Sequence, residues 1–258
     1  MHWRFLRSAA DDGPGNMALD DALMGRSART GEAVFRVYAW STPTLSLGRN
    51  QRARGAYDAG KARELGVAFV RRPTGGRALL HHHEVTYSVT MPTADAAQAA
   101  TAYDFINTVL LGGLARLGVR ATCATCATGA PSIPPGLRPC FDAPSEREIV
   151  LNGRKLVGSA QWRRAGALLQ HGSILIRDDQ ALIGRLMYAR LAESPAAATL
   201  ADAMDREPEI DDVAGVLREA LDIVIGRNSS TLVVEADVAA DAARMRITYS
   251  DDTWTWRR

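Results

Sequence analysis

The sequence predicts an α+β fold, with mixed, mainly antiparallel sheets flanked by helices, in a single domain that spans residues 1–258. Two observations carry this prediction. Several short β-like runs are joined by two-residue turns typical of antiparallel hairpins. Between them lie segments whose apolar residues repeat at helical spacing. Antiparallel strands with interspersed helices are typical of an α+β domain, and 47% hydrophobic residues are enough for a sizeable core.

The N-terminal part is expected to alternate helices and strands. A helix is predicted over 15–29, where acidic residues occupy the early turns, and a short one over 57–65, where Gly66 can cap the end. Strands are predicted where β-branched and aromatic residues gather, over 33–40, 44–48, 67–71 and 85–91.

A long helix and a long loop come next. Apolar residues repeat at helical spacing over 103–117, which predicts a helix packed on a sheet. Residues 124–145 hold five of the eleven prolines and break every periodic pattern. A loop of that length in a compact domain is more often functional than not.

A meander of three antiparallel strands is predicted after this loop. Asn152-Gly153 is the strongest short-range hairpin signal, and Ala165-Gly166 supplies a second turn. These turns join β-type runs over 147–151, 155–162 and 167–176. The remaining chain is expected to hold helices, clearest over 213–224, and one strand over 231–234.

Charge and composition exclude several classes of function. Lys plus Arg total 31 against 29 for Asp plus Glu, so a net charge of +2 gives no field that would gather nucleic acid. No apolar run approaches the length of a membrane span, and charges interrupt the first residues where a signal peptide would be apolar. Three cysteines make a poor disulfide framework. We therefore expect a cytoplasmic protein with no nucleic-acid or membrane partner.

The first segment that carries chemistry is RRPTGGRALLHHHEVTYSV, over 71–89. Glycine lets backbone N–H groups approach a ligand closely, so Thr74-Gly75-Gly76 can wrap a polar head group. Nearby positive charge would favour a phosphate or carboxylate and is available from Arg71, Arg72 and Arg77. The spacing fits neither a P-loop nor a dinucleotide-binding fingerprint, and an ordinary β-turn is the alternative.

Three consecutive histidines, His81 to His83, precede Glu84 in this segment. In a strand neighbouring side chains point to opposite faces, so at most His81 and His83 could share a ligand. No third ligand is specified, and we expect no metal site. The preferred interpretation is one histidine facing a ligand pocket and the others solvated.

The second segment is LNGRKLVGSAQWRRAGALLQHGSILI, over 151–176. A lysine partly buried in a β-cleft, here Lys155, can hold a carboxylate or polarise an acyl carbonyl. The alternative is an ordinary exposed strand lysine. The small residues Gly158-Ser159-Ala160 leave room beside it, and His171-Gly172 falls on the adjacent strand.

The cysteines need separate explanations. Cys140 lies in the proline-rich loop between Pro139 and Phe141, and a nearby cation such as Lys155 could lower its pKa and make it a nucleophile. A small buried hydrophobe is the alternative. Cys123 and Cys126 form a lone C-x-x-C without a second ligand pair, so we expect it to be incidental.

Together these segments resemble the catalytic domain shared by biotin ligases, lipoate ligases and lipoyl or octanoyl transferases. The resemblance covers about residues 16–176, and its matching stretches are NMALDDAL, PTLSLGRNQ and the two segments described above. It implies a biotin/lipoate-ligase-like catalytic fold. The implied substrate-binding residues are Arg72, Thr74, Gly75, Gly76, Arg77, Ala78, His81, Gly158, Ser159, Ala160, His171 and Gly172.

Within that superfamily, T-G-G-R, E-x-T-Y-S and C-F-D-A-P-S before the N-G-R-K strand are most similar to octanoyl-protein transferases of the LipM type. There a cysteine 15 positions before the lysine takes octanoate as a thioester, which implies Cys140 and Lys155 as catalytic residues. The implied donor is octanoyl-phosphopantetheine on acyl carrier protein, and the acceptor is a lipoyl domain or the glycine-cleavage H protein. No other cofactor is implied. His82 departs from the family, which usually has Asp there.

Three alternatives stay open. An ATP-dependent lipoate ligase would use ATP and Mg, with Arg72, Arg77 and Lys155 holding the adenylate phosphate. An amidotransferase would keep the cysteine and take its acyl group from another carrier protein. A non-catalytic protein that binds acyl carriers or lipoyl domains belongs to a different class, and an intact Cys140 and Lys155 count against it.

Overall fold

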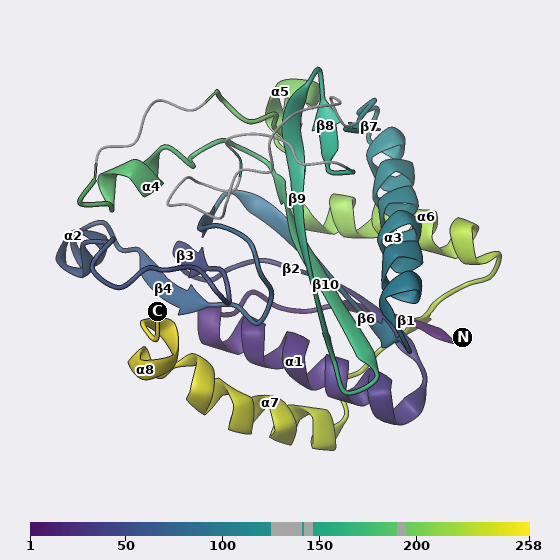
Figure 1. Cartoon of the computed structure of the whole chain (residues 1–258). Coiled ribbons are helices and arrows are strands. Elements are labelled where there is room, and N and C mark those ends of the chain that lie inside the picture. Colours follow the sequence, from purple (N-terminus) through teal and green to yellow (C-terminus); the bar gives the residue numbers. More distant parts are fainter. Residues whose placement is uncertain (125–140, 142–146, 190–194) are drawn as a thin grey trace.

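The computed structural model describes residues 1–124, 141, 147–189 and 195–258, and within them two sheets are flanked by helices (Figure 1). The main sheet has eight strands in the order β11-β1-β2-β6-β10-β9-β8-β7, and a smaller one has the order β4-β3-β5. In chain order the elements are β1 (Trp3–Arg7), α1 (Gly13–Thr30), β2 (Ala33–Tyr38), β3 (Thr44–Leu47), α2 (Ala59–Glu64), β4 (Ala68–Arg71), β5 (Leu79–His81), β6 (Glu84–Pro92), α3 (Ala96–Arg116), β7 (Thr122–Cys123), β8 (Ile149–Leu151), β9 (Arg154–Arg164), β10 (Ala167–Leu175), α4 (Leu182–Arg185), α5 (Leu200–Met204), α6 (Ile210–Ile225), β11 (Ser230–Thr231), α7 (Ala236–Tyr249) and α8 (Asp252–Thr255).

Helices cover both faces of the main sheet, so its central strands are buried on both sides (Figure 1). Neighbouring residues of β2 show how this works, because successive side chains point to opposite faces. Val34 packs with Leu23 of α1 and Val238 of α7. Phe35 belongs to the opposite core cluster, with Ile106 of α3 and residues of α6. The predicted mixed, mainly antiparallel α+β fold is confirmed.

The predicted meander is confirmed as β8, β9 and β10, which pair antiparallel in sequence. Both turns have left-handed backbone, with φ of 50° and 75° at Asn152 and Gly153 and of 50° and 79° at Ala165 and Gly166. Two consecutive positive φ values define the turn whose twist matches that of antiparallel strands. The hairpin signals in the sequence therefore predicted both turns of the meander.

The predicted helices are present with shifted ends. Helix α1 begins two residues earlier than predicted because the Asp12 side chain accepts a hydrogen bond from Gly15 N, and Gly31 at φ 70° ends it. Helix α3 begins at Ala96, well before the predicted 103, because the Asp95 side chain accepts from Gln98 N. Side-chain caps at the N-terminal ends thus set boundaries that apolar periodicity could not locate.

Three strands were not predicted, and one was predicted too long. Strands β1, β5 and β7 are short, and β1 lies parallel to both of its neighbours, β2 and β11. The predicted strand over 231–234 shrinks to Ser230–Thr231, because only these residues pair with β1. Leu232 follows with its N–H bonded to Phe5 O at 2.8 Å. Such pairs join distant parts of the chain and leave no local signal.

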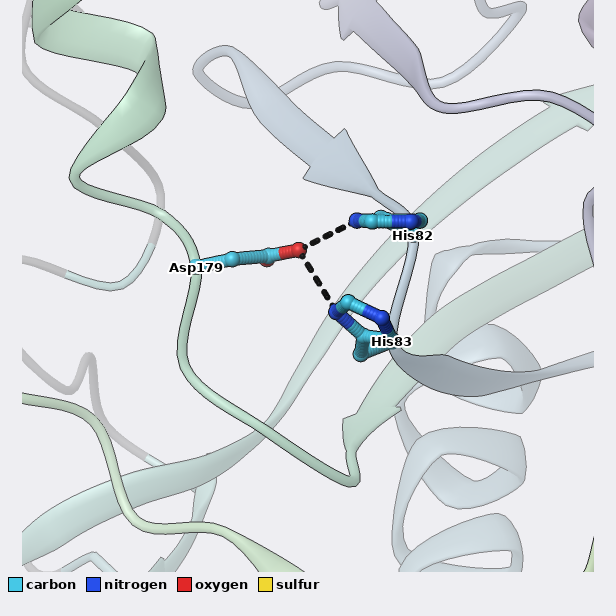
Figure 2. Close-up of side chains that lie close together, drawn as sticks. All are labelled: His82, His83 and Asp179. Atoms are coloured by element: carbon cyan, nitrogen blue, oxygen red, sulfur yellow. Dashed lines mark hydrogen bonds and ion pairs between the residues drawn. The ribbon is translucent and has the colours of Figure 1, made fainter.

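The expectation that His81 and His83 could share a ligand is wrong. β5 ends at His81, and the next two residues form a bend, so the alternation of a strand does not apply to them. His82 and His83 instead point the same way, and both bond one carboxylate oxygen of Asp179 (Figure 2). His81 points elsewhere and is 5% exposed.

The two ends of the predicted long loop lie together. Residues 125–140 and 142–146 lie outside the described part of the chain. Ala124 N donates to Glu148 O at 2.7 Å, and Arg147 N donates to Ala124 O at 3.0 Å, so the loop leaves and returns at one place beside β8. Among the helices of the described residues, none is long and apolar enough to cross a membrane.

Candidate active site

A cavity of about 510 Å³ brings together most of the residues expected to bind a substrate. Its walls come from the Gly-rich segment on one side and from β9 and β10 on the other. The predicted residues that line it are Arg72, Gly75, Gly76, Arg77, His81, Lys155, Gly158, Ser159, Ala160, His171 and Gly172. Further lining residues that the sequence did not predict are Met17, Tyr38, Trp40, Leu79, Thr86, Tyr103, Arg147, Glu148, Gln161 and Ser173.

Some expected residues do not line this cavity. Thr74 is buried behind the wall and Ala78 packs in the core of the smaller sheet. Arg71, expected to surround the ligand with charge, points away and donates to Gly48 O, Gln51 O and Thr255 O. Burial and the nearby arginines lower the pKa of Arg71 to about 10. Cys140 lies outside the described residues.

Arg72 shapes the Gly-rich loop from within. Its guanidinium donates to Gly75 O at 2.9 Å, to Arg77 O at 2.7 Å and to Ser46 Oγ at 2.9 Å. Gly76 has φ of 97°, which favours glycine, and its carbonyl lies so close to Gly48 that a Cβ there would come within 2.0 Å of the oxygen. Two glycines and one arginine therefore fix the path of the loop.

Lys155 is buried in the cavity wall and paired. Its side chain is 2% exposed, and Nζ donates to Glu148 Oε1 at 2.6 Å. Nζ also lies 4.9 Å from the centre of the Phe141 ring. The carboxylate and the aromatic ring fix the position of the Lys155 side chain in the cavity wall. The alternative of an exposed strand lysine is wrong.

The small residues of β9 and β10 keep space for Lys155. A Cβ on Gly158 would lie 3.0 Å from Lys155 Cε and 3.3 Å from Nζ. A Cβ on Gly172 would come within 2.4 Å of Gly158 O and 2.8 Å of the Tyr87 ring. Glycine at 158 therefore leaves room for the end of the Lys155 side chain, and glycine at 172 lets β10 lie close to β9 and the Tyr87 ring.

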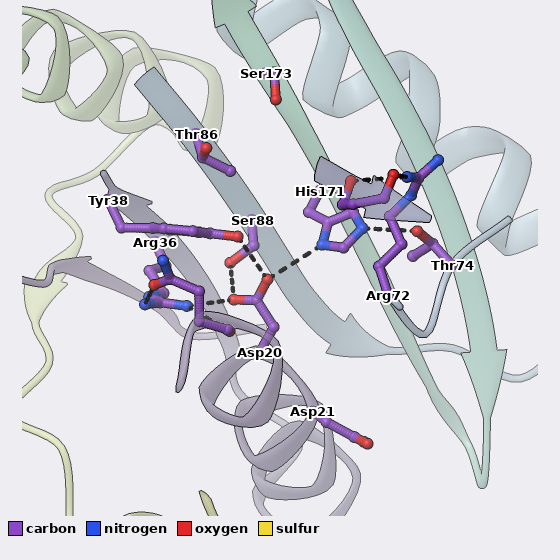
Figure 3. Close-up of polar contacts among 12 residues, drawn as sticks. Asp20, Asp21, Arg36, Tyr38, Arg72, Thr74, Thr86, Ser88, His171 and Ser173 are labelled. Atoms are coloured by element: carbon purple, nitrogen blue, oxygen red, sulfur yellow. Dashed lines mark hydrogen bonds and ion pairs between the residues drawn. The ribbon is translucent and has the colours of Figure 1, made fainter. Parts of the chain in front are cut away.

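A chain of buried hydrogen bonds connects α1 to the Gly-rich loop (Figure 3). Asp20 bonds Arg36 Nη1 at 2.7 Å, and its Oδ2 lies 3.2 Å from His171 Nδ1. His171 Nε2 then lies 2.7 Å from Thr74 Oγ1. Asp20 also accepts from Ser88 Oγ at 2.7 Å. The loop is thus positioned by an acid on a helix far away in the sequence.

The pKa values define the protonation states in this chain. Burial opposes ionisation of Asp20, but the Arg36 charge and the hydrogen bonds from His171 and Ser88 outweigh it and hold its pKa below the ordinary value. Burial lowers the pKa of His171, an effect that Asp20 offsets only in part. A neutral His171 donates from Nδ1 to the Asp20 carboxylate, so its Nε2 accepts the Thr74 hydroxyl proton.

A second buried network holds His81 in the cavity wall. Its Nδ1 lies 2.7 Å from Glu84 Oε1, its Nε2 lies 2.7 Å from Ser46 Oγ, and its ring stacks on Trp40 at 3.9 Å. Glu84 Oε1 also accepts from Ser173 Oγ at 2.8 Å. His81 faces the cavity as expected, with both ring nitrogens bonded to protein groups.

Sequence reasoning missed Glu148 and Asp20. Glu148 lies within the strand predicted over 147–151, where an acid has no distinctive spacing from Lys155. Asp20 occurs in NMALDDAL, a stretch of the resemblance whose acids were assigned only to the helix macrodipole. Asp20 is completely buried, at 0% exposure, and this burial distinguishes it from an ordinary helix acid. Burial is not visible in the sequence.

Replacing Asp20 is expected to destabilise the fold strongly. Asp20→Asn would leave the Arg36 guanidinium, whose side chain is 1% exposed, buried without its counter-charge. Losing one partner of a buried ion pair costs about 3–5 kcal/mol, so the urea midpoint should fall sharply. The exposed Asp205, in left-handed backbone that asparagine tolerates, is the matched control: Asp205→Asn should change stability by less than about 0.5 kcal/mol. Equal midpoints for both variants would contradict this account.

Comparison with known proteins identifies the family of this chain. The family model described as the lipoyl protein ligase A/B catalytic domain matches residues 12–222. An octanoyltransferase LipM of Kyrpidia tusciae is 35% identical over 272 residues, covering 99% of this chain and 99% of that protein. An octanoyltransferase LipM of Symbiobacterium thermophilum is 36% identical over 283 residues, covering 100% of this chain and 99% of its own length.

The fold is also shared with solved structures. A crystal structure of lipoate-protein ligase A bound with ATP superimposes with a TM-score of 0.81, at 19% identity, over 99% of each chain. That likeness concerns the fold, whereas the sequence relatives share more than a third of their residues over nearly their whole length. The chain belongs to the lipoyl protein ligase A/B catalytic-domain family and is an acyltransferase.

Proposed function

We propose that this protein transfers an octanoyl group from acyl carrier protein to a lysine of a lipoyl domain or of the glycine-cleavage H protein, through a thioester on Cys140. The observation that carries the proposal is the pairing of Lys155 with Glu148 inside a cavity of about 510 Å³. That volume lies in the ~300–1,000 Å³ range of small-ligand sites. The proposed acyl group is octanoyl because relatives that match this chain over nearly their whole length are named octanoyltransferase.

In the first transfer the Cys140 thiolate attacks the carbonyl carbon of the octanoyl thioester. A new C–S bond forms, the bond to the phosphopantetheine sulfur breaks, and that sulfur leaves as a thiolate that takes up a proton. In the second transfer the acceptor amine attacks the acyl-enzyme, a C–N bond forms and Cys140 leaves as thiolate. The amine loses one proton to solvent, so both steps balance without a further co-reactant.

Lys155 is the electrostatic partner of both steps. A compact ammonium near the carbonyl stabilises the oxyanion that develops in each transfer, and it also favours the thiolate. Support comes from Phe141, the residue next to Cys140 in the chain, whose ring lies against the ammonium. Glu148 positions the lysine. The Gly75 and Gly76 segment, shaped by Arg72, lies across the same cavity and would orient the acyl group.

The ATP-dependent ligase is less well supported by the same contacts. That activity would have Arg72, Arg77 and Lys155 hold an adenylate phosphate. Arg72 already donates to the oxygens of Ser46, Gly75 and Arg77. Glu148 would stand beside any phosphate that approached Lys155, and two anions there repel each other. No requirement for ATP is proposed.

An acyl-transfer assay tests this function. The purified protein is mixed with octanoyl-acyl carrier protein and an apo lipoyl domain, with and without ATP and Mg, and product is measured by intact mass. We expect octanoylated lipoyl domain in both mixtures at the same rate. A third mixture replaces octanoyl-acyl carrier protein with free octanoate, ATP and Mg, and product formed only in that mixture would overturn the proposal and establish a ligase.

The donor and acceptor are tested in parallel mixtures. Octanoyl-H protein as sole donor, with apo lipoyl domain as acceptor, reports amidotransfer between two carrier proteins. A faster reaction from this donor than from octanoyl-acyl carrier protein would keep Cys140 in its role and change the donor. Apo H protein and apo lipoyl domain, offered in competition, identify the preferred acceptor.

A further inference from the structure

We propose that His82, His83 and Asp179 form a binding site for one transition-metal dication of the Zn²⁺ class, outside the cavity. The three side chains each offer a ligand atom, and these atoms lie within 4.8 Å of one another. Figure 2 shows both imidazoles turned toward the same carboxylate oxygen. None of the three residues lines the cavity, so the ion takes no part in acyl transfer.

The two distances from the imidazoles to the carboxylate are close to those around a tetrahedral ion. His82 Nδ1 lies 2.8 Å and His83 Nδ1 lies 3.2 Å from Asp179 Oδ2. Bonds of about 2.0–2.1 Å to zinc separate neighbouring tetrahedral ligands by roughly 3.3 Å, so both nitrogen–oxygen distances are near that spacing, and all three ligand atoms lie within 4.8 Å of one another. Two hydrogen bonds now converge on Oδ2, and a cation replaces the two shared protons. Two imidazoles and one carboxylate favour Zn²⁺, Ni²⁺ or Cu²⁺ over Mg²⁺ or Ca²⁺, and water completes the coordination.

The backbone on both sides of the cluster is already fixed. Buried Gln180, next to Asp179, accepts from Leu80 N at 3.1 Å and donates to Leu80 O at 2.8 Å. On the other side His83 O accepts from Ile176 N at 2.9 Å. These bonds hold the bend after β5 against the segment between β10 and α4. Little chain freedom remains to be lost when the ion binds, which is the condition for a preorganised site.

The cluster is also accessible. The side chains of His82 and His83 are 38% and 41% exposed and that of Asp179 is 22% exposed. A hydrated ion can therefore enter without movement of the fold. The ion would clamp two segments that meet beside His81, and so would raise the stability of this edge of the molecule rather than alter the chemistry of the cavity.

Calorimetric titration of tag-free, chelator-treated protein with zinc sulfate tests the proposal. We expect one saturable site per chain in the wild type and a higher melting temperature with zinc. His82→Gln, His83→Gln and Asp179→Asn should each weaken binding by at least about tenfold, because even outer partners of a metal cost that much. His2→Gln, at an exposed histidine outside the cluster, should bind as the wild type does.

Thiols are the competing ligands, and spectroscopy separates them. X-ray absorption of the one-to-one complex should show nitrogen and oxygen at about 2.0–2.1 Å and no sulfur at about 2.3 Å. Cys123→Ser should keep the site. A sulfur shell, affinity that survives both histidine substitutions, or no saturable binding would each overturn the proposal. None of these measurements requires turnover, so they stand whether or not octanoyl transfer is found.

Discussion

Cys140→Ala is expected to abolish acyl transfer, lowering the rate by ~10³-fold or more, as losing a nucleophile does. An alanine cannot accept the acyl group, so the octanoyl adduct on the protein should also disappear. Intact-mass measurement after mixing with octanoyl-acyl carrier protein should show one adduct on the wild type and none on the variant. Adduct and turnover are two readouts of one step, and both should vanish together.

The remaining cysteines provide the matched control. Cys123 is exposed and Cys126 lies outside the described residues, and neither belongs to a motif of the resemblance. The double variant Cys123→Ser/Cys126→Ser should keep both the adduct and the transfer rate. Loss of transfer in that folded double variant would show that the C-x-x-C is not incidental. Full activity in Cys140→Ala would remove the thioester mechanism and promote the ATP-dependent ligase.

Lys155→Arg is expected to cut the transfer rate by about 10²–10³-fold although the positive charge is kept, which is the cost of losing one oxyanion donor. The planar guanidinium presents its donors in a fork and cannot replace a compact ammonium at one oxygen. The arginine can still pair with Glu148, so the variant should fold. Stopped-flow measurement of acyl transfer, with the urea midpoint as the stability control, gives both quantities.

The alkylation of Cys140 separates the two roles of Lys155. It is followed in the Cys123→Ser/Cys126→Ser background, so that one thiol reacts. Removing the ammonium in Lys155→Ala should raise the pH at which Cys140 reacts, because a thiolate loses a nearby positive charge. Glu148→Gln should lower that pH, because it removes a negative charge that offsets the ammonium, 2.6 Å away, and disfavours the thiolate.

If the pH at which Cys140 reacts rises in Lys155→Ala and falls in Glu148→Gln, general loosening of the fold is excluded. Loosening would shift that pH in the same direction in both variants. An unchanged alkylation profile in Lys155→Ala, with transfer still impaired, would leave the lysine only as a ligand of the acyl carbonyl. Wild-type transfer rates in both lysine variants would remove Lys155 from the site.

The local elements of this protein were predictable from its sequence. Helices α1 and α6, strands β4 and β6 and the meander all arise from short-range rules: periodicity, turn residues with left-handed backbone, and the placement of glycine. The Gly-rich segment and the strand pair of Lys155 and His171 were expected to share one site, and both line one cavity. That expectation came from the resemblance to a known family, in which both segments contribute to one catalytic domain.

Contacts between distant residues were not predictable. Asp20 reaches His171, 151 positions away, because the packing of α1 against the sheet brings the two side chains together. Arg71 and Arg72 are neighbours in sequence with the same charge, yet one bonds the C-terminal segment and the other shapes the Gly-rich loop. Charge and spacing in the sequence do not specify toward which partners these side chains point.

The amino-acid sequence by itself determined the α+β class, the two hairpin turns and the two segments that meet at the cavity, because backbone preferences act over a few residues. Only the tertiary structure decided the parallel pairing of β1 with β11, the buried Asp20 network and the carboxylate beside Lys155. It also turned His82 and His83 to one side, against strand alternation. Burial and counter-charge are properties of the packed chain, and they fix the electrostatics of this site.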